Sequence, residues 1–150
     1  MTSIFHMRMN MKDAQMCLLL KQILIVSLNI LAEMIAYKLV RRGRDGNLYP
    51  LFIDRNRPYI FGEHRTAEYI PTKGFAPRLG FHCCFTPYAP HLKQHLKSGE
   101  KRVWIECEID DFKTYPRPPS QGGEWILAQK LTALRIISDD MVKELNSLAK

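Results

Sequence analysis

The chain changes its pattern of hydrophobic and polar positions near residue 37. After that point it contains short stretches typical of β-strands, separated by turn-forming residues. The segment Tyr37–Ile53 predicts two strands joined by a turn at Asp45-Gly46-Asn47. From residue 54 to residue 78 the periodicity is weak, which predicts a long loop with one short strand near Tyr59–Phe61.

Three further stretches predict strands in the second half of the chain. Residues 79–85, LGFHCCF, form a short apolar run. In residues 102–110, inward-facing hydrophobic side chains alternate with Trp104, Glu106 and Glu108, as in a strand with two distinct faces. Residues 126–137 are mostly apolar, so we expect a central strand that is buried on both faces.

Helical patterns are found at both ends of the chain and once in between. Residues 1–36 predict an N-terminal amphipathic helix, with Gln15, Gln22, Asn29 and Glu33 forming one polar stripe among apolar residues. A short helix is expected from Pro90 to Ser98-Gly99, and a C-terminal helix capped by Ser138 or Asp139. The fold class is therefore α+β, with residues 37–150 forming one domain around a mostly antiparallel sheet.

The N-terminal helix predicts packing or self-association through residues 13–36. Lys21 and Glu33 leave only eleven uncharged residues between them, too few for a transmembrane span. A small-residue cleavage site after a clean apolar stretch is also missing, which argues against a signal peptide. Four cysteines without paired spacing indicate a reducing compartment. Together these features predict a cytoplasmic protein.

Positive charge is concentrated in the middle of the chain. Residues 38–102 contain thirteen Lys and Arg and only five Asp and Glu, within a chain of net charge +7. This excess favours an anionic partner, either a nucleotide or an anionic macromolecule such as nucleic acid.

The segment Arg78–Leu96 contains three of the five histidines and two of the four cysteines. A zinc site could be drawn from Cys84, His91 and His95, with the two histidines four residues apart on the expected helix. That spacing matches no standard zinc motif, so we expect no metal. A Cys–His nucleophile is compatible with the spacing but lacks a flanking motif of any cysteine-protease family.

Two segments together resemble a known enzyme family. GFHCCFTPYAPH, containing His82, and GGEWILAQKLTALRII, containing Glu124, resemble in order two conserved elements of the poly(ADP-ribose) polymerase type of ADP-ribosyltransferase. YKLVRRG, containing Arg42, is similar to the first strand of transferases with an Arg-Gly at that point. The chain departs from the family in lacking its His-Gly-Ser/Thr and Ser-Thr-Ser motifs and in having His82 where the polymerases have tyrosine.

The resemblance implies an ADP-ribosyltransferase-like fold with NAD as substrate. Glu124 would stabilise the cationic transition state and His82 would contact the nicotinamide ribose. Arg42 would hold the phosphates, with Arg78 adding to the basic surroundings. The activity implied is ADP-ribosyl transfer or NAD cleavage. The chain also resembles small phage and bacterial proteins that share the GFH-C strand, a likeness that implies no activity.

The alternative prediction is a non-enzymatic accessory protein that binds nucleic acid or a host component. It rests on cationic side chains interleaved with aromatic ones, a pattern that suits phosphate contacts and base stacking. These residues are Arg55, Arg57, Arg65, Lys73 and Arg78, with Tyr59, Phe61, Tyr69 and Phe75.

Overall fold

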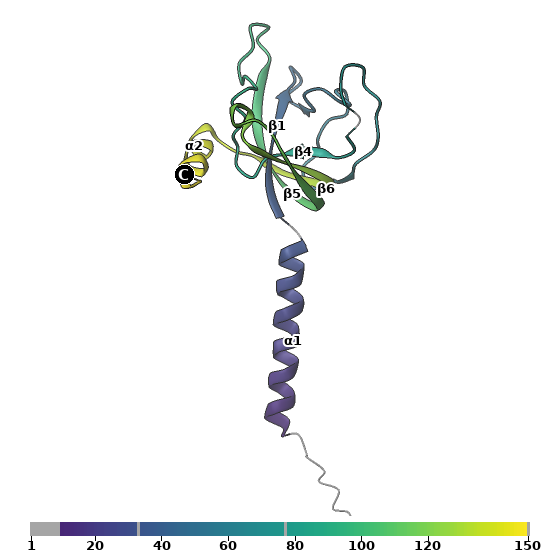
Figure 1. The fold of residues 1–150 in the computed structure, drawn as a ribbon, viewed down its shortest axis with the longest axis vertical. Coiled ribbons are helices and arrows are strands. Elements are labelled where there is room, and N and C mark those ends of the chain that lie inside the picture. The colour runs from purple at the N-terminus through teal and green to yellow at the C-terminus, as the bar shows by residue number, and fades with distance from the viewer. Residues whose placement is uncertain (1–9, 33, 77, 150) are drawn as a thin grey trace, which may run out of the picture. The chain divides into compact units, whose positions relative to one another are not determined.

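The computed structural model describes residues 10–32, 34–76 and 78–149, and for residues 25–32 the backbone alone. The chain divides between Ala32 and Glu33 into two compact units. The first contains helix α1, Met11–Ala32. The second, which we call the β-domain, contains six strands and helix α2 (Figure 1). The predicted α+β class with a mostly antiparallel sheet is confirmed.

Helix α1 exposes apolar side chains around its surface. Leu18, Leu20 and Leu24 are each about 60% exposed. Glu33 lies outside the described residues, so the predicted polar stripe is described only in part. Within the described part of the chain, no helix is long and apolar enough to cross a membrane.

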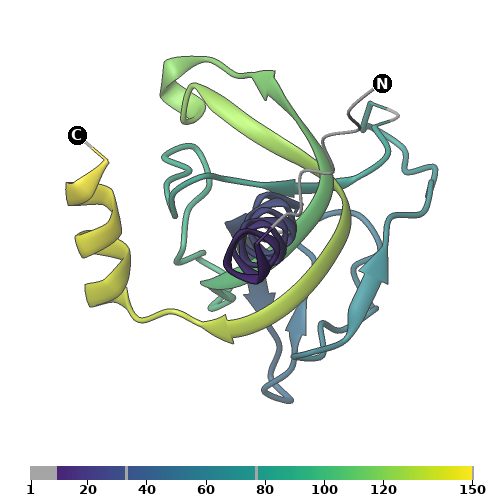
Figure 2. The ribbon, with the colours of Figure 1, turned by 90° about the horizontal axis from the view of Figure 1, so that it is seen from below.

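The sheet of the β-domain is antiparallel and strongly curled. Its strands run in the order β2-β1-β5-β6-β3, and β4 pairs with β6 beside β3. Figure 2 shows how the long β5–β6 hairpin bends around the domain. The strands are β1 Met34–Arg42, β2 Leu48–Tyr49, β3 His64–Thr66, β4 Phe81–Cys83, β5 Lys101–Pro116 and β6 Glu124–Ile136.

Strand β4 closes the curled sheet on itself. Its residues pair with Ile126–Ala128 of β6, and the next residue, Cys84, exchanges two backbone hydrogen bonds with Tyr37 of β1. Tyr37 N donates to Cys84 O at 2.9 Å and Cys84 N donates to Tyr37 O at 2.7 Å. The ring of strands is therefore β1, β5, β6 and β4.

Each face of the sheet carries its own hydrophobic core because side chains alternate along the strands. Ala36 and Val40 of β1 face one core with Ile105, and Tyr37 and Leu39 face the other. Strand β6 lies between β5 and β3, which confirms its predicted central position. It is buried on both faces only along Trp125–Ala128, and the expectation of such burial as far as Ile137 is wrong, because Arg135 and Ile136 are exposed. Helix α2, Asp139–Leu148, packs Met141, Val142 and Leu145 against the second core.

The predicted capping residue and hairpin turn are confirmed. The Ser138 side chain accepts a hydrogen bond from Met141 N at 3.2 Å, as an N-cap does. Gly46 has φ +82° in the turn between β1 and β2, a conformation that glycine adopts without steric cost.

The prediction of a helix from Pro90 to Ser98-Gly99 is wrong. These residues form turns and irregular backbone instead. Arg102 N donates to Gln94 O at 3.0 Å, and His95 forms a β-bridge with Lys101. The segment thus uses its backbone groups to extend the sheet beside the start of β5, which a helix could not do.

Candidate functional site

A large cavity lies in the β-domain beside β4. It has a volume of about 670 Å³, within the range of pockets that hold small organic ligands. Its wall combines β1, the long segment between β2 and β4, and residues at the turn of the β5–β6 hairpin.

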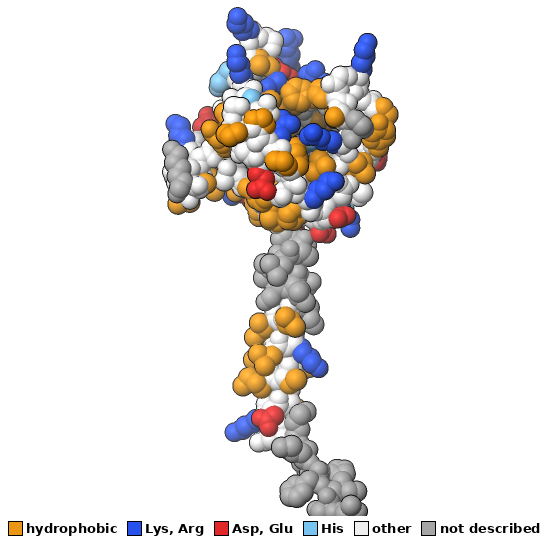
Figure 3. Space-filling model, in the orientation of Figure 1, with side chains coloured by type: hydrophobic (Ala, Val, Ile, Leu, Met, Phe, Trp, Pro, Cys, Tyr) orange, Lys and Arg blue, Asp and Glu red, His pale blue; other side chains and the backbone are white. Residues whose placement is uncertain are grey.

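The cavity wall carries a strong excess of positive charge. Six Lys and Arg line it, against two acids, Asp54 and Glu68. Figure 3 shows Lys and Arg side chains set among hydrophobic ones on one face of this domain. The cations are Lys38, Arg57, Arg65, Lys73, Arg78 and Arg117.

Arg65 is the most buried of these cations. Its side chain is only 5% exposed, and its guanidinium lies over the rings of Tyr59, at 4.6 Å, and Phe81, at 5.6 Å. One nitrogen, Nη2, lies 3.7 Å from a carboxylate oxygen of Asp54, whereas Nε and Nη1 are buried without a hydrogen-bond partner. Unpaired donors on a buried cation are costly to folding unless a partner satisfies them.

Lys38 projects from β1 between Ala36 and Val40, two residues of the first core. Its Nζ donates to the backbone oxygen of His82 at 2.9 Å. Burial lowers the pKa of Lys38, but the Tyr59 phenol and the thiols of Cys83 and Cys107 raise it more, so the net pKa is raised. Lys38 is therefore a cation at neutral pH.

A second group of polar side chains lies around His82. The imidazole Nδ1 is joined to the Tyr115 hydroxyl by a hydrogen bond of 2.6 Å. Burial, together with the charges of Lys38, Arg78 and Arg117, lowers the pKa of His82 to about 4, so its ring is neutral at pH 7. The guanidinium of Arg78 lies 5.1 Å from the centre of the Tyr115 ring, and that of Arg117 lies 5.4 Å from the Trp125 ring.

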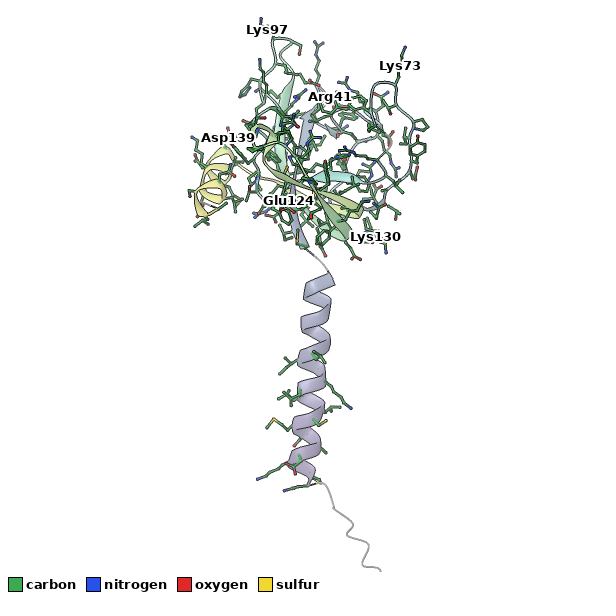
Figure 4. The ribbon with its side chains drawn as sticks, viewed as in Figure 1. Arg41, Lys73, Lys97, Glu124, Lys130 and Asp139 are labelled. Carbon is green, nitrogen blue, oxygen red and sulfur yellow. The ribbon has the colours of Figure 1, made fainter. Side chains whose placement is uncertain are left out.

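The residues implied by the family resemblance are only partly brought together. His82 and Arg78 line the cavity, whereas Arg42 and Glu124 are exposed and are not among its lining residues. Arg42 ends β1, opposite Lys101, and Glu124 begins β6, opposite Pro116. Figure 4 shows Glu124 well away from Lys73 of the cavity wall.

The cationic and aromatic residues of the alternative prediction are brought together more completely. Arg55 and Phe61 lie outside the cavity lining, and the other seven residues of that set belong to it. Phe75 also contacts Phe52, with ring centres 5.6 Å apart, and both rings are partly exposed. The long segment between β2 and β4 therefore forms a basic and aromatic wall.

The described residues offer no metal centre: no three His, Cys, Asp or Glu side chains group closely enough to hold an ion. Cys84 and His91 line the cavity, and His95 does not. Burial raises the pKa of the Cys84 thiol to about 12, which keeps it protonated at neutral pH and makes it a poor nucleophile.

The sequence did not point to Lys38, Tyr115, Arg117 or Trp125 as cavity residues. The sequence does mark Lys38 as unusual, because it is a charged residue at an inward-facing position of a largely apolar strand. The other three lie at the hairpin turn, and only the closure by β4 brings them beside His82.

Comparisons of the chain with protein-family models, with curated proteins and with solved structures gave no match.

Proposed function

We propose that the β-domain is a nucleotide-binding module and that its cavity holds the nucleotide. The observation that carries the proposal is Arg65, a cation 5% exposed, with two guanidinium nitrogens that have no hydrogen-bond partner in a basic cavity. Guanidinium groups bind phosphate through paired hydrogen bonds, and a buried one binds it more strongly than an exposed one.

In this proposal the two ends of the ligand contact different parts of the wall. Lys38 and Arg65 hold the phosphate groups at the interior end. The partly exposed ring of Phe75 stacks with the base, because Tyr59, Tyr115, Trp125 and Phe52 already carry guanidinium groups.

ADP-ribosyl transfer or NAD cleavage is the enzymatic form of this proposal, and it requires Glu124 at the ribose of bound NAD. Because Glu124 is exposed and outside the cavity lining, the geometry supports binding better than turnover. The alternative of a host or nucleic-acid partner at the same wall is also weaker, since a large partner would not reach Arg65.

Isothermal titration of the full chain with adenosine, ADP and NAD tests the proposal. ADP and NAD should bind at least about ten-fold more tightly than adenosine, because only they carry phosphate for Lys38 and Arg65. Equal affinity for adenosine and ADP, or no binding of either, would refute the anion site. Release of nicotinamide from NAD, lost in Glu124→Gln, would establish the enzymatic form.

A further inference from the structure

A second basic surface lies at one end of the β-domain, outside the cavity. In the antiparallel pairing of β1 with β5, Arg41 stands opposite Arg102, and Arg42 stands opposite Lys101. The segment of residues 93–97 lies on the other side of β5, joined to it by the hydrogen bond from Arg102 N to Gln94 O. Three neighbouring backbone segments thus carry cationic side chains at this end of the domain.

We call this surface the basic rim. Figure 4 places two of its members, Arg41 and Lys97, at the same end of the domain. Its cations come from β1 and the turn that follows it, from residues 93–97 and from the start of β5: Arg41, Arg42, Arg44, Lys93, Lys97, Lys101 and Arg102.

Acidic side chains neutralise only a small part of the basic rim. Glu100 pairs with Arg41 at 3.2 Å and also with Arg55 at 3.5 Å. Asp45 accepts hydrogen bonds from Tyr49 and Asn47, which hold its pKa below the usual value. Among the described residues, six of the seven rim cations form no ion pair: Arg42, Arg44, Lys93, Lys97, Lys101 and Arg102.

Facing like charges on neighbouring strands destabilise a sheet. The rim has two such pairs in succession, Arg41 with Arg102 and Arg42 with Lys101. Side chains alternate along a strand, so Arg41 and Arg102 lie on one face of the sheet and Arg42 and Lys101 on the other. A polyanion bound across the end of these strands would relieve the repulsion within both pairs. This arrangement favours a partner with closely spaced negative charges.

The aromatic rings at the rim are covered by its own guanidinium groups. Arg41 lies 4.8 Å from the centre of the Tyr49 ring, and Arg102 lies 5.7 Å from that of Phe52. Single-stranded nucleic acids bind largely through bases stacked on free aromatic rings, whereas a duplex backbone needs only cations. We propose that the basic rim binds the phosphate backbone of a nucleic acid duplex without sequence preference.

Fluorescence anisotropy of the full chain with a labelled duplex of mixed sequence tests the proposal, with salt varied from about 50 to 200 mM. The double variant Arg42→Glu with Lys101→Glu should bind at least about ten-fold more weakly. Its slope of log affinity against log salt should fall by about 2, because two phosphate contacts are lost.

The matched control is Lys113→Glu with Lys143→Glu, two exposed lysines elsewhere whose replacement changes the net charge equally. It should keep most of the affinity. An equal loss in the control, tighter binding to single strands or to vesicles of anionic lipid, or no duplex binding near 50 mM salt would overturn the proposal. Nucleotide binding in the cavity is measured separately, since none of the seven rim cations lines it.

Discussion

His82 links the chemistry of the cavity to the stability of the fold. Its ring is held by Tyr115 and surrounded by three cations, and its pKa is lowered from 6.5 to about 4. When a histidine stays neutral in the folded protein, the free energy of unfolding decreases as the pH falls, because the unfolded chain takes up the proton first.

We therefore expect the contribution of His82 to the free energy of unfolding to be complete above pH 6.5 and to disappear as the pH falls to 4. The loss at low pH amounts to as much as about 3 kcal/mol. Urea unfolding measured across this range checks it. His82→Asn should flatten the dependence, while His64→Asn, a change at an exposed histidine of β3, should leave it as in the wild type. An unchanged dependence in His82→Asn would contradict the assignment.

At the residue scale the sequence predicted some cavity members and missed others for one reason. Arg65 and Arg78 were found because a basic and aromatic segment is visible in the sequence itself. Lys38, Tyr115 and Arg117 come from three separate strands or loops, and only the pairing of β4 with both β1 and β6 brings them together. Such long-range pairing leaves little local signal.

The short strand β4 is the element on which the cavity depends most. Gly80 precedes it with φ +138°, and a Cβ there would lie 2.7 Å from Leu127 Cγ and 3.1 Å from the backbone oxygen of Ala128. Glycine therefore allows both the backbone conformation and the close approach to β6.

Gly80→Ala should destabilise the domain by at least about 2 kcal/mol, through backbone strain and the clash with β6. Gly46→Ala is the matched control, since Gly46 also has positive φ but has open space around it, and about 1 kcal/mol is expected. Chemical denaturation gives both values, and amide exchange at Phe81–Cys83 should accelerate most in Gly80→Ala. Equal costs would show that the contact with β6 contributes nothing.

Local sequence patterns predicted most elements but failed where tertiary pairing decided the outcome. The turn at Asp45-Gly46 and the cap at Ser138 depend on local hydrogen bonds and were predicted correctly. The segment after Pro90 has local helix signals, yet its backbone pairs with β5. Strand-like hydrogen bonds to the nearby start of β5 outweighed weak helix propensity there.

At the scale of the whole molecule, α1 and the β-domain are separate compact units. The β-domain has hydrophobic cores of its own, whereas α1 exposes Leu18, Leu20 and Leu24 to solvent. Exposed apolar side chains on a helix favour association with a second copy.

We expect a chain that lacks residues 1–32 to unfold at the same temperature as the full chain and to be monomeric. The full chain should self-associate through α1, in line with the self-association predicted for residues 13–36. Sedimentation velocity and thermal denaturation check both points, and Leu20→Glu with Leu24→Glu in the full chain should weaken association. A monomeric full chain at high concentration would contradict this role.

Titration of ADP into the Arg65→Met variant measures whether the cavity binds the anionic part of a nucleotide through Arg65. Methionine fills similar apolar space beside Tyr59 and Phe81 and removes a half-paired buried charge, so the unfolding free energy should change by less than about 1 kcal/mol. ADP affinity should fall at least about ten-fold, while Arg135→Met, at an exposed arginine paired with Glu106, should bind as the wild type does. Unchanged ADP affinity in a folded Arg65→Met protein would show that Arg65 does not bind the nucleotide.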